Sequence, residues 1–152
     1  MIKKNSIKIL ILLFFLLSCG YSPIYTSKNS NFSVVELITT GNNNLNRIIS
    51  GKLSIYKDSN ASKQLTLTIN TSLEKEVSSK DTKGNPKTYR VNLKSNVLIK
   101  DSKGIEKNKI FFKSLDYSNK DNKFDLRKFE NKISKNLAEK IADELIIYLQ
   151  LN

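Results

Sequence analysis

The sequence predicts an α+β domain in which two helices pack on one face of a four-stranded, mainly antiparallel sheet, in the chain order β-α-β-β-β-α. Three observations predict it: a segment rich in β-branched residues precedes a helical pattern, three middle segments alternate apolar with polar residues, and the last segment is a long amphipathic helix. The 152 residues are enough for one such domain and too few for two well-buried ones.

The first strand and the first helix are expected at residues 32–40 and 43–56. Residues 32–40 are rich in β-branched and apolar side chains, and Gly41 ends that run. Asparagines at positions 42–44 can accept hydrogen bonds from the free N–H groups of a first helical turn. The apolar residues that follow have the spacing of one helix face: Leu45, Ile48, Ile49, Leu53 and Tyr56.

The next three strands are expected to form a meander. Residues 65–73 alternate leucine or isoleucine with polar residues, which is typical of a strand with one buried face. The turn-forming cluster 80–86 separates this strand from residues 89–99, which alternate in the same way. A second turn at residues 101–104 leads to a last strand at residues 110–117.

The last element is a long amphipathic helix, for which Asp125 is a candidate N-cap. Its apolar residues recur at every fourth position: Phe129, Ile133, Leu137, Ile141, Leu145 and Leu149. Ala138 and Ala142 widen this apolar stripe. We therefore expect this helix to cover the sheet together with the first one.

The first 18 residues have the parts of an export signal. Residues 9–17 are an unbroken apolar run, shorter than the roughly 20 residues that a membrane-spanning helix needs. A positive region precedes this run and contains Lys3, Lys4 and Lys8. We expect residues 1–18 to be a cleaved signal peptide, residues 19–31 a tether and residues 32–152 the single folded domain.

The segment Leu16-Leu17-Ser18-Cys19-Gly20 resembles the lipobox of bacterial lipoproteins, in which the cysteine is acylated when the signal is cleaved. Cys19 is the only cysteine, so it cannot form an intramolecular disulfide, and lipidation explains a lone thiol in an exported chain. Gly20 stands where inner-membrane lipoproteins carry an aspartate, so the expected location is the periplasmic side of the outer membrane. The alternative is an ordinary cleaved signal followed by a chance cysteine.

The side chains of the commonest catalytic sites are missing. The sequence has no histidine, and its one cysteine is assigned to lipid, which excludes Ser-His and Cys-His nucleophiles and the common zinc sites. Asp116, Asp121 and Asp125 could form a carboxylate cluster for metal or acid–base chemistry. The alternative is a solvated loop before a helix, with Asp125 at the positive helix end. We expect no enzyme activity, no metal and no cofactor.

Basic residues outnumber acidic ones, 26 to 14. Such a charge usually indicates nucleic-acid binding, but an exported lipoprotein does not normally meet nucleic acid. An envelope protein does meet anionic lipid, above all lipopolysaccharide, whose phosphates bind lysine and arginine. Two clusters are candidates: Lys80, Lys83, Lys87 and Arg90, and Lys120, Lys123, Arg127 and Lys128. The alternative is a solvated basic surface that reflects base composition.

The order of elements and three local stretches resemble LptE, a lipoprotein family of lipopolysaccharide assembly. The stretches are Cys19-Gly20-Tyr21-Ser22-Pro23-Ile24-Tyr25, Thr88-Tyr89-Arg90-Val91-Asn92-Leu93 and Ser114-Leu115-Asp116-Tyr117-Ser118-Asn119. The resemblance covers essentially the whole chain, and none of its motifs is catalytic. It implies a two-helix, four-stranded domain that plugs the outer-membrane barrel protein LptD, helps that barrel to assemble and contacts lipopolysaccharide.

The charge pattern and the resemblance together give two sets of candidate contact residues. The set for lipopolysaccharide is Lys83, Lys87, Arg90, Arg127 and Lys128. The set for a polar barrel lumen lies on the polar faces of the meander strands and comprises Thr66, Thr68, Asn92 and Asn96. For this second set the alternative is simple exposure to solvent.

Two other functions stay open at this point. An auxiliary lipoprotein of another envelope lipid transporter would share the anchor and the basic surface, and it would copurify with ATP-driven transport components. A lipoprotein enzyme would lose turnover when Asp116 or Asp125 is replaced.

Overall fold

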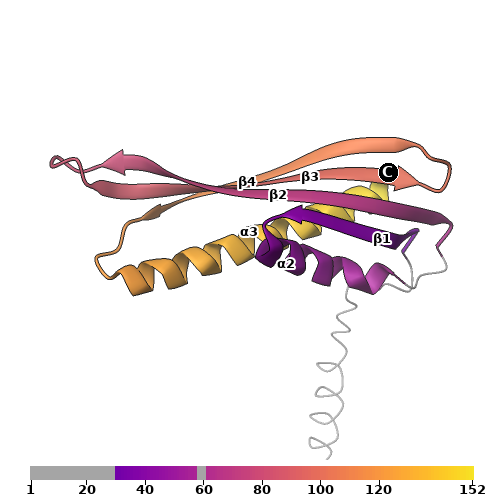
Figure 1. Cartoon of the computed structure of the whole chain (residues 1–152), viewed down its shortest axis with the longest axis horizontal. Coiled ribbons are helices and arrows are strands. Elements are labelled where there is room, and N and C mark those ends of the chain that lie inside the picture. Colours follow the sequence, from indigo (N-terminus) through magenta and orange to yellow (C-terminus); the bar gives the residue numbers. More distant parts are fainter. Residues whose placement is uncertain (1–29, 58–60) are drawn as a thin grey trace, which may run out of the picture.

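The computed structural model describes residues 30–57 and 61–152. Its elements in chain order are β1 (Phe32–Gly41), α2 (Asn43–Leu53), the 3₁₀ helix η2 (Ser54–Tyr56), β2 (Lys63–Lys80), β3 (Pro86–Asp101), β4 (Glu106–Ser118) and α3 (Lys123–Leu151). Both helices lie on the same face of the sheet, which gives two layers (Figure 1). The predicted α+β class and element order are confirmed.

The four strands lie in the order β1-β2-β3-β4. β1 and β2 are parallel, because α2 carries the chain back between them, whereas β2–β3 and β3–β4 are antiparallel hairpins. Alternate residues of the strands face the helices, and Leu65, Leu67 and Ile69 of β2 are fully buried there. The sheet is therefore mainly antiparallel, as its alternating pattern predicts.

The two helices close the core from one side. On α3 the residues at every fourth position are buried from Ile133 to Leu149, and Ala138 and Ala142 between them are buried too. On α2 the buried face consists of Leu45, Asn46, Ile49 and Leu53. The apolar stripes of both helices thus meet the apolar face of the sheet.

The long β hairpins give the domain two distinct ends. β2 has 18 residues, which corresponds to a strand of about 60 Å. We call the end with the β2–β3 turn, residues 81–85, the hairpin end. The opposite end holds the β3–β4 turn and the C-terminus, and we call it the terminal end (Figure 1). Asn31 Nδ2 donates a hydrogen bond to the Gln150 carbonyl at 2.7 Å, so the first described residues also lie at the terminal end.

Two strands are longer than the sequence predicts, and one helix has a different N-cap residue. β2 continues through residues 74–80 and β4 begins at Glu106, because backbone pairing with β3 holds these polar segments without an apolar pattern. The expectation that Asp125 caps the last helix is wrong. Asn122 is the N-cap, and its Oδ1 accepts hydrogen bonds from the N–H groups of Phe124 at 2.9 Å and Asp125 at 3.3 Å.

One polar side chain lies without a partner inside this core. Ser95 of β3 is fully buried between Thr71 and Phe111 in the sheet register, and its Oγ has no hydrogen-bond partner among the described residues. An unpaired buried hydroxyl is costly. We expect Ser95→Ala to raise the free energy of unfolding by about 1 kcal/mol. Urea unfolding followed by circular dichroism measures this, and an unchanged or lower value would contradict it.

Candidate functional site

The β2–β3 turn presents the first basic residues of the candidate site. Asp81 Oδ1 accepts hydrogen bonds from the backbone N–H groups of Lys83 and Asn85, both at 2.8 Å. The hydrogen bonds from Asn85, first the backbone and then the side chain, lower the pKa of Asp81. Gly84 supplies the positive φ of 84° that this turn needs. The turn therefore holds Lys83 exposed at the tip of the hairpin.

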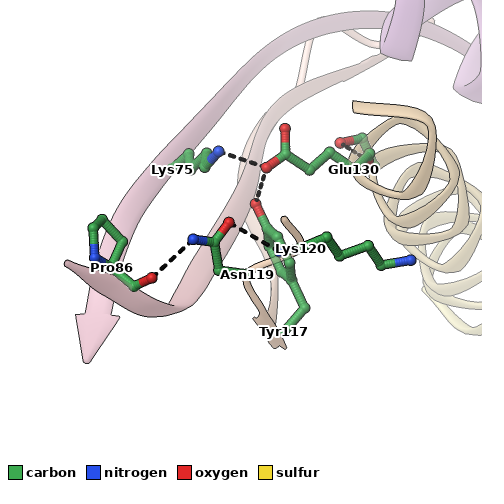
Figure 2. A network of polar contacts seen from close by, with 7 residues as sticks. Lys75, Pro86, Tyr117, Asn119, Lys120 and Glu130 are labelled. Atoms are coloured by element: carbon green, nitrogen blue, oxygen red, sulfur yellow. Dashed lines mark hydrogen bonds and ion pairs between the residues drawn. The ribbon is translucent and has the colours of Figure 1, made fainter. Parts of the chain in front are cut away.

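The second group of basic residues starts α3 and is joined to the hairpin by Asn119. The backbone N–H of Asn119 donates to the Lys87 carbonyl at 2.8 Å. The Asn119 Nδ2 donates to the Pro86 carbonyl at 2.9 Å (Figure 2). This joint holds the start of α3, with Arg127 and Lys128, at the hairpin end of the domain (Figure 1). Two of the predicted basic groups, far apart in sequence, are thus brought to one end.

A network of polar contacts around Glu130 holds the first half of α3 against the sheet. Glu130 Oε1 accepts hydrogen bonds from Lys75 Nζ at 2.5 Å and from the Tyr117 hydroxyl at 2.7 Å (Figure 2). The ammonium group of Lys75 also lies 4.0 Å from the centre of the Tyr89 ring. Aromatic contacts of Tyr117 with Tyr89 and Phe129 extend the same network.

Burial and hydrogen bonding act in opposite directions on Glu130. Burial raises the pKa of this carboxyl, but the hydrogen bonds from Lys75 and Tyr117, together with the positive charges of Lys75 and Lys123, lower the pKa overall. For Tyr117, burial and then the hydrogen bond to Glu130 both raise the pKa of the hydroxyl. Glu130 is therefore held as a carboxylate between two donors.

We expect Glu130→Gln to lower the free energy of unfolding at about pH 7 by about 1–2 kcal/mol. Because the folded-state pKa of Glu130 is lowered, its contribution is present above the unfolded-state pKa and is lost as the pH falls through the folded-state value. At acid pH, the free energy of unfolding of the variant should therefore also depend less steeply on pH. Urea titrations across the acid range measure both effects, with the exposed Glu139→Gln on the same helix as control. Equal behaviour of the two variants would contradict the role of the network.

Arg90 is placed apart from the other predicted lipopolysaccharide contacts. Its Nε and Nη2 donate to the two carboxylate oxygens of Asp116 at 2.7 and 2.8 Å. The hydrogen bond from Arg90 lowers the pKa of Asp116, and Asp116 raises that of Arg90. Both residues lie on the sheet face without helices, opposite each other on β3 and β4. Two donors of the guanidinium are thus engaged within the sheet.

The three aspartates considered for catalysis do not form a metal-binding group. Asp116 is paired with Arg90, and Asp125 lies in the first turn of α3. Within residues 30–57 and 61–152, no group of three or more cysteine, aspartate or glutamate side chains is placed to hold a metal ion. The solvated-loop interpretation therefore describes Asp125 better than the cluster does.

The residues predicted to face a barrel lumen all lie on the face without helices. Thr66 and Thr68 of β2 are half-buried there, and Asn96 of β3 is exposed. Asn92 Nδ2 donates to Glu76 at 3.3 Å, and its Oδ1 accepts from the Ser114 hydroxyl at 2.8 Å. The four predicted residues thus share one face of β2 and β3, where Thr68 lies opposite Leu98 and Asn96 lies opposite Ile110.

The same face also carries exposed apolar residues that the pattern did not single out. They are Ile38, Leu98, Ile110 and Phe112, each more than a third exposed. Phe111 is buried under the helices while its neighbour Phe112 is exposed, since successive strand residues point to opposite faces. This period of two is the signal that could have located Phe112. An open depression of about 460 Å³ lies beside it, lined by Glu76, Arg90, Asn92, Ser114 and Asp116.

Some predictions concern residues outside the described part of the chain. The signal peptide 1–18, the lipidated Cys19 and most of the tether 19–31 fall there. Among the helices of the described residues, none combines the length and the apolar character needed to cross a bilayer.

Solved structures of bacterial lipoproteins share this fold. Rare lipoprotein B from Shewanella oneidensis matches with a TM-score of 0.62 at 16% identity, covering 76% of this chain and 91% of that one. A minor lipoprotein from Acinetobacter baumannii matches with 0.60 at 11% identity, covering 82% and 94%. Lipoprotein B from Nitrosomonas europaea matches with 0.61 at 9% identity, covering 83% and 90%.

In sequence, no protein-family model and no curated protein matches the chain. The structural alignment nevertheless covers 90% or more of each of the three solved lipoproteins. The chain therefore has the fold of these three bacterial lipoproteins.

Proposed function

We propose that this chain is a non-enzymatic, lipid-anchored outer-membrane lipoprotein of lipopolysaccharide transport, which plugs and helps to assemble the LptD barrel and contacts lipopolysaccharide. Rare lipoprotein B is a name of the LptE family, so the shared fold supports this proposal. In the proposal, Cys19 carries the acyl chains that hold the protein on the periplasmic side of the outer membrane, and nucleic acid is not a partner.

The observation that carries the proposal is the gathering of basic residues at the hairpin end. Lys83 and Lys87 come from the hairpin, and Arg127 and Lys128 come from the first turns of α3. All four side chains belong to exposed residues, and their charges are free to meet the phosphates of a lipid headgroup. Lysine binds such phosphates as a point charge, so recognition does not require a bidentate arginine.

The polar face of the sheet supports the barrel part of the proposal. Thr66, Thr68, Asn92 and Asn96 present hydroxyl and amide groups on the face without helices. The inner walls of outer-membrane barrels are polar, so these groups can exchange water for hydrogen bonds to a barrel wall. Exposed Ile110 and Phe112 add apolar contact area on the same face.

Charge reversal tests the contact with lipopolysaccharide. We expect Lys83→Glu with Arg127→Glu to weaken binding of purified lipopolysaccharide to the mature protein by about tenfold or more, because two cations at one end become anions. The matched control is Lys103→Glu with Lys107→Glu, which makes the same charge change at the terminal end. Circular dichroism checks that both variants are folded. Equal affinities of the two double variants would remove the hairpin end as the binding site.

Crosslinking in intact envelopes tests the barrel contact. A photoreactive amino acid at Asn96, which is exposed on the polar face, should crosslink to an outer-membrane barrel protein that mass spectrometry identifies as LptD. Depletion of this chain should also reduce the amount of assembled barrel. Crosslinks to components of an ATP-driven transporter, with surface lipopolysaccharide intact after depletion, would instead establish the auxiliary lipoprotein of another lipid transporter.

A further inference from the structure

β1 is much shorter than β2 and leaves half of β2 with a free edge. The pairing of β1 with β2 ends at Gly41 opposite Thr71, whereas β2 continues to Lys80. Within the described residues, residues 72–80 pair with β3 on one side and with no strand on the other. In Figure 1 the β1 arrow ends part of the way along β2. We call residues 72–80 on this side the open β2 edge.

Backbone donors and acceptors point toward this open β2 edge. The Thr71 carbonyl accepts a hydrogen bond from the Asn42 N–H at 3.0 Å, so the peptide groups of Thr71 face the β1 side. Alternate residues of a strand direct their N–H and C=O groups to the same side. Leu73, Lys75 and Val77 therefore present theirs to the open edge, up to the register shift that follows Val77. Such a row of backbone groups is a template for an added strand.

The two faces beside the open β2 edge differ in chemistry. On the face without helices, Glu74 and Glu76 are exposed. On the helix side, Leu73 is half-buried and Val77 is 42% exposed, and Lys75 between them is paired with Glu130. Beside Leu73 a cavity of about 470 Å³ lies between α2 and α3, and its lining combines the apolar Leu45 and Ile48 with polar and charged side chains. An added strand would thus meet carboxylates on one face and, on the other, two apolar side chains on either side of a lysine whose charge Glu130 already neutralises.

We propose that the open β2 edge is a β-augmentation site for an extended segment of another protein in which lysine or arginine alternates with apolar residues. The basic residues would lie beside Glu74 and Glu76 as cross-strand pairs of opposite charge. The apolar residues would lie over Leu73 and Val77, next to the cavity.

Charge argues against a second copy of this chain as the occupant. Antiparallel pairing of two copies, centred on any of residues 74–76, places Glu74 opposite Glu76 or one glutamate opposite itself. Like charges directly opposite each other destabilise a sheet. The same acids that prevent self-association thus select a basic partner.

Amide hydrogen exchange of the mature protein with a defined peptide tests the proposal. The probe is an end-blocked peptide of alternating lysine and valine, and the control peptide has glutamate in place of lysine. We expect the lysine peptide to slow exchange of the Leu73, Lys75 and Val77 amides and to bind at least about tenfold more tightly than the glutamate peptide. Glu74→Lys with Glu76→Lys should reverse the preference, whereas Glu106→Lys, on the same face of β4, should leave it unchanged.

Each other outcome overturns the proposal. Unchanged exchange of the three amides at saturating peptide would show that the edge does not accept a strand. Protection without peptide that grows with protein concentration would assign the edge to a second copy. Protection without peptide at every concentration would assign it to the chain's own residues. None of these results depends on whether the hairpin end binds lipopolysaccharide.

Discussion

Gly41→Ala is expected to lower the free energy of unfolding by about 2–4 kcal/mol. Gly41 ends β1 with a φ of 86°, a backbone conformation that side chains with a Cβ atom rarely adopt. An added Cβ would also lie 2.1 Å from the Thr71 carbonyl oxygen. That oxygen accepts the Asn42 N–H, so moving it away would break the bond that starts α2 beside β2.

Gly104→Ala is the matched control for this effect. Gly104 has nearly the same φ, 81°, but an added Cβ would meet no atom within 4 Å. For Gly104→Ala we expect the free energy of unfolding to fall by only about 1 kcal/mol, because only the backbone conformation is strained. Urea unfolding of both variants separates the steric effect from the conformational one. Equal losses would show that the approach of Gly41 to Thr71 does not restrict this junction.

Leu145→Ala is expected to lower the free energy of unfolding by about 2–5 kcal/mol, because it opens a cavity in the centre of the core. Leu145 of α3 is fully buried in the cluster that joins both helices to the sheet. Leu151→Ala is the control, because it makes the same substitution on the same helix at a residue that is 80% exposed. Its free energy of unfolding should change by less than about 0.5 kcal/mol. Similar losses for the two variants would contradict the packing of α3 on the sheet.

The core of this domain could be predicted from the sequence because burial imposes a period. Leu65, Leu67 and Ile69 alternate with polar residues, and Ile141 and Leu145 lie four apart, so a strand and a helix with one apolar face each were specified locally. The polar extensions of β2 and β4 lacked such a pattern. Backbone pairing with β3 holds them, and backbone hydrogen bonds do not require any alternation of apolar and polar side chains.

The candidate site was predictable in composition but not in arrangement. Lys83 and Arg127 were recognised as basic residues of two separate clusters, yet their common position depends on Asn119, which bonds the start of α3 to the hairpin. Arg90 carries the same positive charge as its lysine neighbours, and only the register of β3 with β4 pairs it with Asp116. Contacts between strands distant in sequence decide both outcomes.

The α+β class, the element order, the buried faces and the basic character of the domain all follow from residue type and local spacing. Two further features required the folded chain: the basic residues of the hairpin and of α3 share one end, and β1 stops at Gly41 while β2 continues. Both depend on where the chain reverses and which strand pairs with which. Those choices are set by packing across the whole sheet, which no local pattern records.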